Sequence, residues 1–296
     1  MNKLTINQFK DKFPDEDACL DYLFQIKYKK LQACTECGGM EKFQRVKDRR
    51  AYQCPLCSHQ LYPTANTVFH KTTTPLHYWF TAIYLFTTTR NGVAAKELER
   101  VLPICYKTAL RMAHQIKKLM HDNSSDLLTG EVMMDEVHIG GLQENMHKSK
   151  RKKLKQGRGG VNKTVVFGMI AKGGLRVVAQ VLPDQKVNSS VLRRIIIKNV
   201  DKDSIVVTDG HHAYEGLGKV FKQHEVVNHR QKEYVRDGYT TNHIENYWST
   251  LKRMIKGTHI HVSKQHLPLY ISENSFRYMY RKKPEQMLDI ILSQIV

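Results

Sequence analysis

The chain has 296 residues, 41% of them hydrophobic, so it can form two or three modules with real cores and is too apolar for a disordered protein. Lysine and arginine number 47 against 28 acidic residues, a formal net charge of +19 that is typical of proteins binding a polyanion such as nucleic acid. No apolar stretch approaches the roughly 20 residues of a membrane span, and there is no signal-peptide core or lipidation signal, which predicts a cytosolic protein without a membrane partner.

Residues 1–65 are expected to form an N-terminal helix, within EDACLDYLFQIKY, followed by a small metal-binding module. Four of the six cysteines fall in two Cys-x-x-Cys pairs, Cys34 with Cys37 and Cys54 with Cys57. This spacing lets four thiolates surround one tetrahedral Zn²⁺, whereas a pair of disulfides, the alternative, is rare in cytosolic proteins. The residues between the pairs alternate as in a β-hairpin. We predict a zinc ribbon whose structural Zn²⁺ has four protein ligands and no open position for catalysis.

Residues 66–125 are expected to be helical. An apolar helix over HYWFTAIYLFTTT comes first, then AAKELERVL, which Pro103 ends, and then the basic, amphipathic YKTALRMAHQIKKLM. This is the plan of a helix-turn-helix, whose second helix can enter a major groove with Tyr106, Lys107, Arg111 and His114 on its DNA face. An ordinary helical hairpin in a core fits the pattern equally well.

Residues 126–296 change to short strands alternating with helices. EVMMDEVHIGG predicts a strand, KTVVFGMIAKGGLRVVAQVLP a hairpin, SSVLRRIIIKNV a helix capped by Ser189 or Ser190, and SIVVTD a buried central strand. KQHEVVNH predicts another strand, and TTNHIENYWSTLKRMIKG a long helix with a threonine cap and Gly257 at its end. This order predicts an RNase H-like α/β domain, with a mixed five-stranded sheet and flanking helices.

A strongly basic loop, residues 147–160, lies between the first of these strands and the hairpin. Like charges at this density resist packing, so we expect a mobile loop that orders on the phosphate backbone of DNA; a solvated surface loop is the alternative. The candidate DNA-binding residues of the loop are Lys148, Lys150, Arg151, Lys152, Lys153, Lys155 and Arg158.

Three acidic residues, far apart in the chain, are expected to meet at one point. Asp135 ends the run VMMD and Asp209 ends IVVTD, on strands that are neighbours in an RNase H-like sheet, and the last long helix could bring Glu245 to them. Two carboxylates held that close repel each other unless a cation lies between them. Oxygen ligands suit Mg²⁺ or Mn²⁺, and two such ions can activate an attacking oxygen and stabilise a leaving one.

Each acid alone also has an ordinary explanation. Asp135 could cap a strand, Asp209 could begin an Asp-Gly turn, and Glu245 could lie on a helix surface. Taken together with the strand order and the basic loop, the three acids favour a two-metal site for phosphodiester cleavage.

The segments MDEVHIGG, VVTDGHHAY and TNHIENYWSTLKRMIKGTHIHVSKQHLPLYISE, preceded by a four-cysteine ribbon, resemble the DDE transposases of prokaryotic insertion sequences related to the Merlin DNA transposons. The resemblance implies a catalytic triad, which maps onto Asp135, Asp209 and Glu245, and cut-and-join chemistry on element ends. In these proteins a lysine often follows the last acid on the same helix. Lys252 fits, being on nearly the same helical face, and would touch DNA near the cut.

The predicted function is therefore that of a transposase that binds terminal inverted repeats and target DNA, cleaves with divalent metal and joins by strand transfer. Joining two ends requires a homodimer or a larger assembly on DNA, which we expect at the prokaryotic nucleoid. Two alternatives remain: a zinc-ribbon DNA-binding regulator with an inactive RNase H-like domain, and a DNA nuclease without strand transfer.

Overall fold

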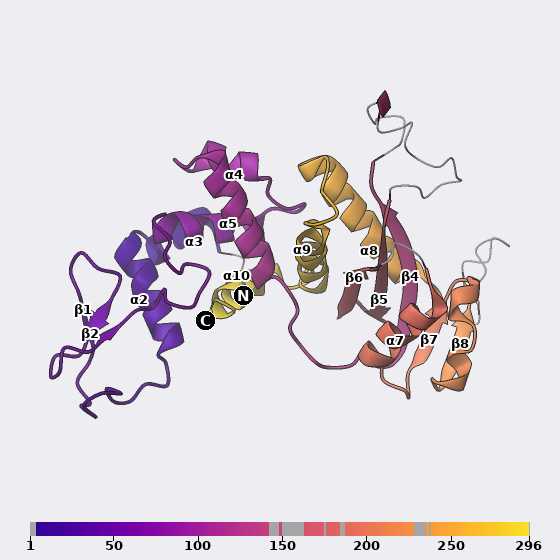
Figure 1. Cartoon of the computed structure of the whole chain (residues 1–296), viewed down its shortest axis with the longest axis horizontal. Helices are drawn as coiled ribbons and strands as arrows, with labels where there is room; N and C mark the ends of the chain where they lie inside the picture. Colours follow the sequence, from indigo (N-terminus) through magenta and orange to yellow (C-terminus); the bar gives the residue numbers. More distant parts are fainter. Residues whose placement is uncertain are drawn as a thin grey trace. The chain divides into compact units, whose positions relative to one another are not determined.

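A computed structural model describes residues 4–141, 148–149, 163–174, 176–183, 187–227, 235–236 and 238–295. Contacts divide the chain into two compact units (Figure 1). Unit 1 comprises Met1–Thr89, Ala95–Leu119 and Lys283–Val296, and unit 2 comprises Arg90–Ala94 and Met120–Lys282. Unit 1 thus joins the predicted ribbon and helical regions, and it includes the C-terminal residues that the sequence pattern groups with the sheet.

Unit 1 is mainly helical. Its helices are α1 (Ile6–Lys12), α2 (Glu16–Lys27), α3 (Leu76–Thr88), α4 (Ala95–Val101), α5 (Tyr106–Leu119) and α10 (Met287–Ser293). The first two begin at side-chain caps, because Thr5 accepts a hydrogen bond from the Gln8 amide and Asp15 accepts one from the Ala18 amide. The apolar helix predicted from HYWFTAIYLFTTT is α3, and it is buried along most of its length.

The ribbon of unit 1 is a small antiparallel sheet of β1 (Gln44–Arg45), β2 (Tyr52–Gln53) and β3 (Gln60–Leu61). The predicted hairpin between the cysteine pairs is confirmed as β1 and β2. Two ion pairs tie this hairpin to the first turn of α2: Arg45 Nη2 lies 2.8 Å from Asp17 Oδ1, and Arg50 Nη2 lies 2.7 Å from Glu16 Oε1. These contacts fix the ribbon against the helix that precedes it.

Unit 2 is built on a mixed five-stranded sheet. Its strands are β4 (Glu131–Ile139), β5 (Thr164–Ala171), β6 (Val177–Val181), β7 (Ile205–Thr208) and β8 (Gln223–Val226), in the spatial order β6-β5-β4-β7-β8. Strand β4 runs antiparallel to β5 and parallel to β7, while β7 and β8 are parallel. The strands and the hairpin predicted from the sequence are all found, and the strand SIVVTD lies inside the sheet as expected.

Helices cover the sheet on both faces. Successive side chains of a strand point to opposite faces, so Met133 and Val137 of β4 pack in one core with α8 (Asn242–Arg253) and α9 (Leu267–Met279). Val132 and Met134 pack in the other core with α7 (Ser189–Asn199) and the 3₁₀ turns η2 (His212–Tyr214) and η3 (Leu217–Lys219). The α8 face therefore receives the odd-numbered residues of β4.

Two helix-end predictions are corrected by the structure, and a third is confirmed in position. The cap of α7 is Asn188, which accepts a hydrogen bond from the Ser190 amide at 2.9 Å, whereas Ser189 and Ser190 lie inside the first turn. The predicted threonine cap of α8 is confirmed in position, because Thr241 is the N-cap residue; its side chain makes no capping hydrogen bond, and the Asn242 amide instead donates to Thr240 Oγ1 at 3.1 Å. Gly257 does not end α8, because the chain continues from Arg253 into a π-helical turn, η5 (Met254–His259).

At the C-terminal end of unit 1, the 3₁₀ turn η6 (Pro284–Gln286) leads into α10. Within the part of the chain that the structure describes, no helix combines the length and apolar composition needed to cross a bilayer.

Candidate functional site

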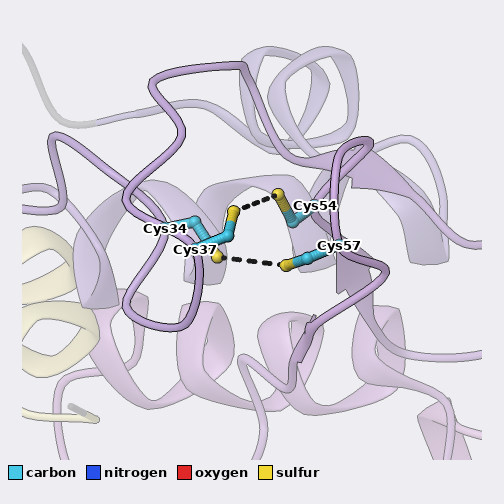
Figure 2. Close-up of side chains that lie close together, drawn as sticks. All are labelled: Cys34, Cys37, Cys54 and Cys57. Atoms are coloured by element: carbon cyan, nitrogen blue, oxygen red, sulfur yellow. Dashed lines mark hydrogen bonds between the residues drawn. The ribbon is translucent and has the colours of Figure 1, made fainter.

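The four ribbon cysteines converge on one point in unit 1 (Figure 2). Their sulfurs all lie within 4.8 Å of one another, with 3.6 Å between Cys34 and Cys57 and 3.8 Å between Cys37 and Cys54. Sulfurs at the corners of a tetrahedron around Zn²⁺, each about 2.3 Å from the ion, are about 3.8 Å apart, so the cluster fits a structural zinc ion.

The turns that carry the cysteines share one hydrogen-bond pattern. The Gly38 amide donates to the Cys34 carbonyl at 2.9 Å, and the Ser58 amide donates to the Cys54 carbonyl at 3.0 Å. Gly38 (φ 69°) and Ser58 (φ 62°) both adopt the left-handed conformation that such a tight turn requires. The sequence predicts this turn at Gly38 but not at Ser58, because serine does not usually mark a positive φ.

Two of the four thiols, Cys34 and Cys57, have shifted pKa values. The backbone amide of Cys37 lowers the pKa of Cys34 to about 6. At Cys57 the His59 amide also lowers the pKa, but burial and the three neighbouring sulfurs outweigh it and raise the pKa to about 12. Four thiolates at this separation therefore need a cation, and binding a metal here releases protons.

In unit 2, Asp135 and Asp209 lie at the same level of two neighbouring parallel strands. The last paired residues of β4 and β7 are Met133 and Val207, and each aspartate follows two positions later. Met133 and Val207 both face α8, so the alternation of side chains turns both aspartates to that face as well. Glu245 lies in the first turn of α8, on the same side of the sheet.

One oxygen of each acid is held by a neighbouring group. Asp135 Oδ2 accepts a hydrogen bond from Trp248 Nε1 at 3.0 Å, and Glu245 Oε1 accepts one from Thr241 Oγ1 at 3.1 Å. Asp209 Oδ1 accepts from the His211 amide at 3.1 Å. Asp209 therefore does cap the turn that follows its strand, and this structural role leaves its second carboxylate oxygen for other contacts.

The three acids influence one another electrostatically. Burial, together with the charges of Asp209 and Glu245, raises the pKa of Asp135 to about 6, although hydrogen bonds from the Glu136 backbone and Trp248 act in the opposite direction. Among the described residues, however, the ribbon cysteines are the one group of three or more ligand side chains whose donor atoms all lie within 4.8 Å. The acids lie near one another, but they are not gathered as closely as the cysteines.

A fourth acid beside them was not predicted. Glu136 follows Asp135 in β4, so it points to the opposite face of the sheet, where Tyr214 is buried. Burial, together with the charges of Asp135 and Asp209, raises the pKa of Glu136 to about 7, and the neighbouring Tyr214 hydroxyl opposes this rise only in part. The adjacent pair Asp-Glu in a predicted strand is the signal that could have indicated an acid on each face.

The partner of Asp135 on the sheet was also missed. Gly168 of β5 is the register partner of Asp135, and Trp248 lies directly over it. A Cβ atom at Gly168 would lie 2.6 Å from Cη2 and 2.7 Å from Cζ2 of Trp248. The absence of a side chain at Gly168 thus lets the indole of Trp248 approach the sheet closely enough to reach the Asp135 carboxylate.

The predicted DNA-binding residues lie in several environments. Lys252 is exposed and lines a shallow groove with Glu245 and Ser249 of α8 and Lys256 of η5. In unit 1, Lys107 and Tyr106 are exposed at the start of α5, His114 is half-buried, and Arg111 donates to Thr72 Oγ1 at 3.2 Å. Lys148 is exposed, and the other loop candidates lie outside the described residues: Lys150, Arg151, Lys152, Lys153, Lys155 and Arg158.

Comparison with known proteins identifies both parts of the chain. Residues 14–60 match the family of the transposase zinc-ribbon domain, and residues 127–279, more than half of the chain, match that of the ISXO2-like transposase domain. An uncharacterized transposase-like protein of Haemophilus influenzae is 31% identical over 121 residues, which cover 41% of this chain and 94% of that protein. Both domain families imply DNA binding, and the matched ranges contain the cysteine cluster and the three acids. The chain therefore belongs to the ISXO2-like transposase family.

Proposed function

We propose that this chain is a DDE transposase whose RNase H-like sheet domain cleaves DNA at the ends of an insertion sequence and joins those ends to target DNA. One observation carries the proposal. Asp135 and Asp209 stand at one level of neighbouring parallel strands, on the face covered by the helix that bears Glu245. Membership of a transposase family supports the assignment of that cluster to DNA chemistry.

Asp135, Asp209 and Glu245 would hold two divalent ions, Mg²⁺ or Mn²⁺, which supply charge neutralisation for an attacking and a leaving oxygen. Three carboxylates on one face form the hard oxygen donor set that these ions prefer. Burial and the neighbouring acids raise the pKa of Asp135 to about 6, which marks a position where a cation stabilises the charged form.

The chain's own residues orient the reaction. Trp248 holds one oxygen of Asp135 in the middle of β4, and the His211 amide holds one oxygen of Asp209 just after β7. In the first step, a water oxygen attacks a phosphorus, the bond to the 3′ oxygen breaks, and a 3′-hydroxyl is released. In the second step that hydroxyl attacks a phosphorus of the target, and the target's 3′ oxygen leaves. No covalent bond to the protein is needed.

Unit 1 would supply much of the DNA recognition. The ribbon and the α4–α5 pair with Lys107 and Arg111 present positive charge for phosphates, and Lys252 near Glu245 adds a positive charge from unit 2. Two element ends must be brought together, so we propose a dimer or larger assembly on DNA, acting at the nucleoid of a prokaryotic cell.

The test uses a DNA fragment that carries the sequences flanking the gene, incubated with the protein and Mg²⁺ or Mn²⁺. Asp135→Ala, Asp209→Ala and Glu245→Ala are each expected to bind this DNA like the wild type and to lose cleavage by at least about a hundredfold. Asp203→Ala removes an exposed carboxylate of the same unit and serves as the matched control, with cleavage unchanged.

Three results would contradict the proposal in different ways. Cleavage retained by a triad variant would refute the residue assignment. Hydrolysis without joined products would identify a nuclease. DNA binding without any metal-dependent nicking by the wild type would identify a regulator.

A further inference from the structure

Unit 2 also has a basic cavity, which lies beside the groove lined by Glu245 and Lys252. It has a volume of about 270 Å³ and is formed by α8, the start of η5, α9 and the segment at Arg90 and Asn91. All of these belong to unit 2. Four arginines line it, namely Arg90, Arg253, Arg277 and Arg281.

The positive charge of this cavity is only partly compensated. Arg277 forms an ion pair with the fully buried Glu273, at 2.8 Å from Nη2 to Oε1. None of the described residues that line the cavity is acidic, and no ion pair with a described residue involves Arg253 or Arg281. Among the residues that the structure describes, the Arg253 guanidinium donates to the Ser249 carbonyl alone, at 3.4 Å. A cavity with this surplus stabilises an anion.

The arginines are held in place before any ligand binds. The guanidinium of Arg281 lies 3.9 Å over the Tyr278 ring and donates to the Gly174 carbonyl at 3.3 Å. Gly174 has φ 66°, which favours glycine, and a Cβ atom there would lie 2.6 Å from Arg281 Nη2, so a larger residue would displace this guanidinium. A pre-organised guanidinium fork loses little entropy when it binds a phosphate.

The segment that carries Arg90 is fixed to the same unit. Thr258 Oγ1 donates to the Asn91 carbonyl at 2.9 Å. Gly92 has φ 86°, and a Cβ atom there would lie 2.7 Å from Glu273 Oε1. The positive φ favours glycine at residue 92, and Arg90, two residues earlier, lines the cavity.

The cavity and the groove are adjacent on α8. Asn246, Thr250 and Arg253 line the cavity, and each follows directly after a residue that lines the groove: Glu245, Ser249 and Lys252. Arg253 lines both. A DNA strand that passes Glu245 can therefore reach the cavity while it stays in contact with α8.

We propose that this arginine cavity binds one phosphodiester of a DNA strand, next to but separate from the acidic site, and so sets the position of the strand relative to Glu245. Planar guanidinium groups bind phosphate oxygens in a bidentate way, and the small volume suits a phosphate with its sugar better than a duplex. The choice of DNA as the source of the phosphate rests on the proposed function.

The test compares Arg90→Gln/Arg281→Gln with the control Arg194→Gln/Lys202→Gln, which removes the same charge from exposed positions of the same unit outside the cavity. Binding to the flanking-sequence DNA is measured without divalent ions, over a salt series. The cavity variant is expected to bind more weakly and to lower the slope of log K against log[salt] by about 1 more than the control does.

Phosphate-ethylation interference then identifies the contact. One or two phosphates whose ethylation blocks the wild type are expected to become neutral for the cavity variant and to stay inhibitory for the control. Arg90→Lys/Arg281→Lys keeps the charge but loses the guanidinium fork. Its ethylation interference at these phosphates is expected to lie between that of the wild type and that of the cavity variant. Inorganic phosphate, added at constant ionic strength, is expected to compete only weakly; full competition at low millimolar phosphate would show a free-phosphate site instead.

An ethylation pattern identical for the wild type and the cavity variant, with equal salt slopes for the variant and the control, overturns the cavity proposal. Because the readout is binding without metal, it is independent of cleavage. Asp135→Ala should give the wild-type pattern. Absence of DNA binding by the wild type would instead overturn the proposed function together with the cavity.

Discussion

Trp248 connects the packing of the sheet to the first acid of the proposed site. Its indole lies over Gly168 and donates to Asp135 Oδ2 at 3.0 Å. A hydrogen bond to a charged group contributes about 1.5–3 kcal/mol, and this one also lowers the pKa of Asp135. The residue thus orients a carboxylate and keeps it ionised, although it contacts no reacting atom itself.

Trp248→Phe keeps the ring and removes the donor. We expect metal-dependent cleavage to fall about tenfold, which corresponds to about 1.4 kcal/mol, with DNA binding unchanged. Because the hydrogen bond holds the pKa of Asp135 down, its loss raises that pKa, so the carboxylate forms only at higher pH. The acid limb of the pH–rate profile is therefore expected to shift to higher pH.

Trp79→Phe is the matched control for this experiment. Trp79 is the other tryptophan of the chain, is buried in unit 1 and donates to Thr72 Oγ1 at 3.3 Å. Its replacement should leave the pH profile of cleavage in place. Equal shifts in both variants would show that Trp248 acts only through general stability.

At the level of single residues, the sequence indicates the acids better than their surroundings. Asp135 and Asp209 could be chosen because each ends an apolar strand pattern. The contact between Trp248 and Asp135 joins residues 113 positions apart and depends on a glycine in a third segment, so no local pattern indicates it. The arginine cavity is also formed by segments far apart in the chain, namely α8, α9 and the segment at Arg90, so no local sequence pattern predicts it.

The ribbon is the element whose stability depends most directly on a metal. Its three strands have two residues each, far too few to bury a core, and four cysteines lie between and beside them. In small modules of this kind, the free energy of zinc binding is the free energy of folding, about 10–16 kcal/mol in zinc-finger peptides.

Removal of zinc by a chelator, or Cys54→Ser, is therefore expected to abolish amide-exchange protection in residues 44–61 and to leave the strands of unit 2 protected. Hydrogen exchange read by mass spectrometry measures both in one sample. Cys105→Ser, an exposed cysteine outside the cluster, is the control and should change neither. Ribbon protection that survives the chelator would argue against a structural zinc.

Elements with strong patterns are predicted well, and their ends are not. The strand at 131–139 and the hairpin at 164–181 follow from runs of apolar residues, because burial of such runs decides the structure. The cap of α7 is Asn188 and not a serine, because the side chain of Asn188 is the one that accepts a hydrogen bond from the Ser190 amide. The π-helical turn after Arg253 likewise replaces the helix end expected at Gly257.

On the scale of the whole molecule, unit 1 is completed by residues from the far end of the chain. Helix α10 packs against α3, and its side chains Met287, Leu288, Ile291 and Leu292 are buried. Each buried side chain of this size stabilises the fold by about 1.5–3 kcal/mol, and together they are comparable with the whole stability of a domain.

A chain truncated after Lys282 is expected to lose the cooperative thermal transition of unit 1 and to keep that of unit 2. Differential scanning calorimetry measures the two transitions. Asp289→Asn removes only the exposed pair with Lys12, at 3.8 Å, and should change the melting temperature little. A truncated protein with an unaltered first transition would show that α10 is dispensable.

The same arrangement has a consequence for synthesis on the ribosome. The surface of α3 that α10 covers stays uncovered until residues 287–293 have emerged, after the entire sheet has been translated. In a growing polypeptide, unit 1 therefore still lacks α10 when all the strands of unit 2 have been translated. Nascent chains stalled before residue 283 are the ones most prone to capture by chaperones.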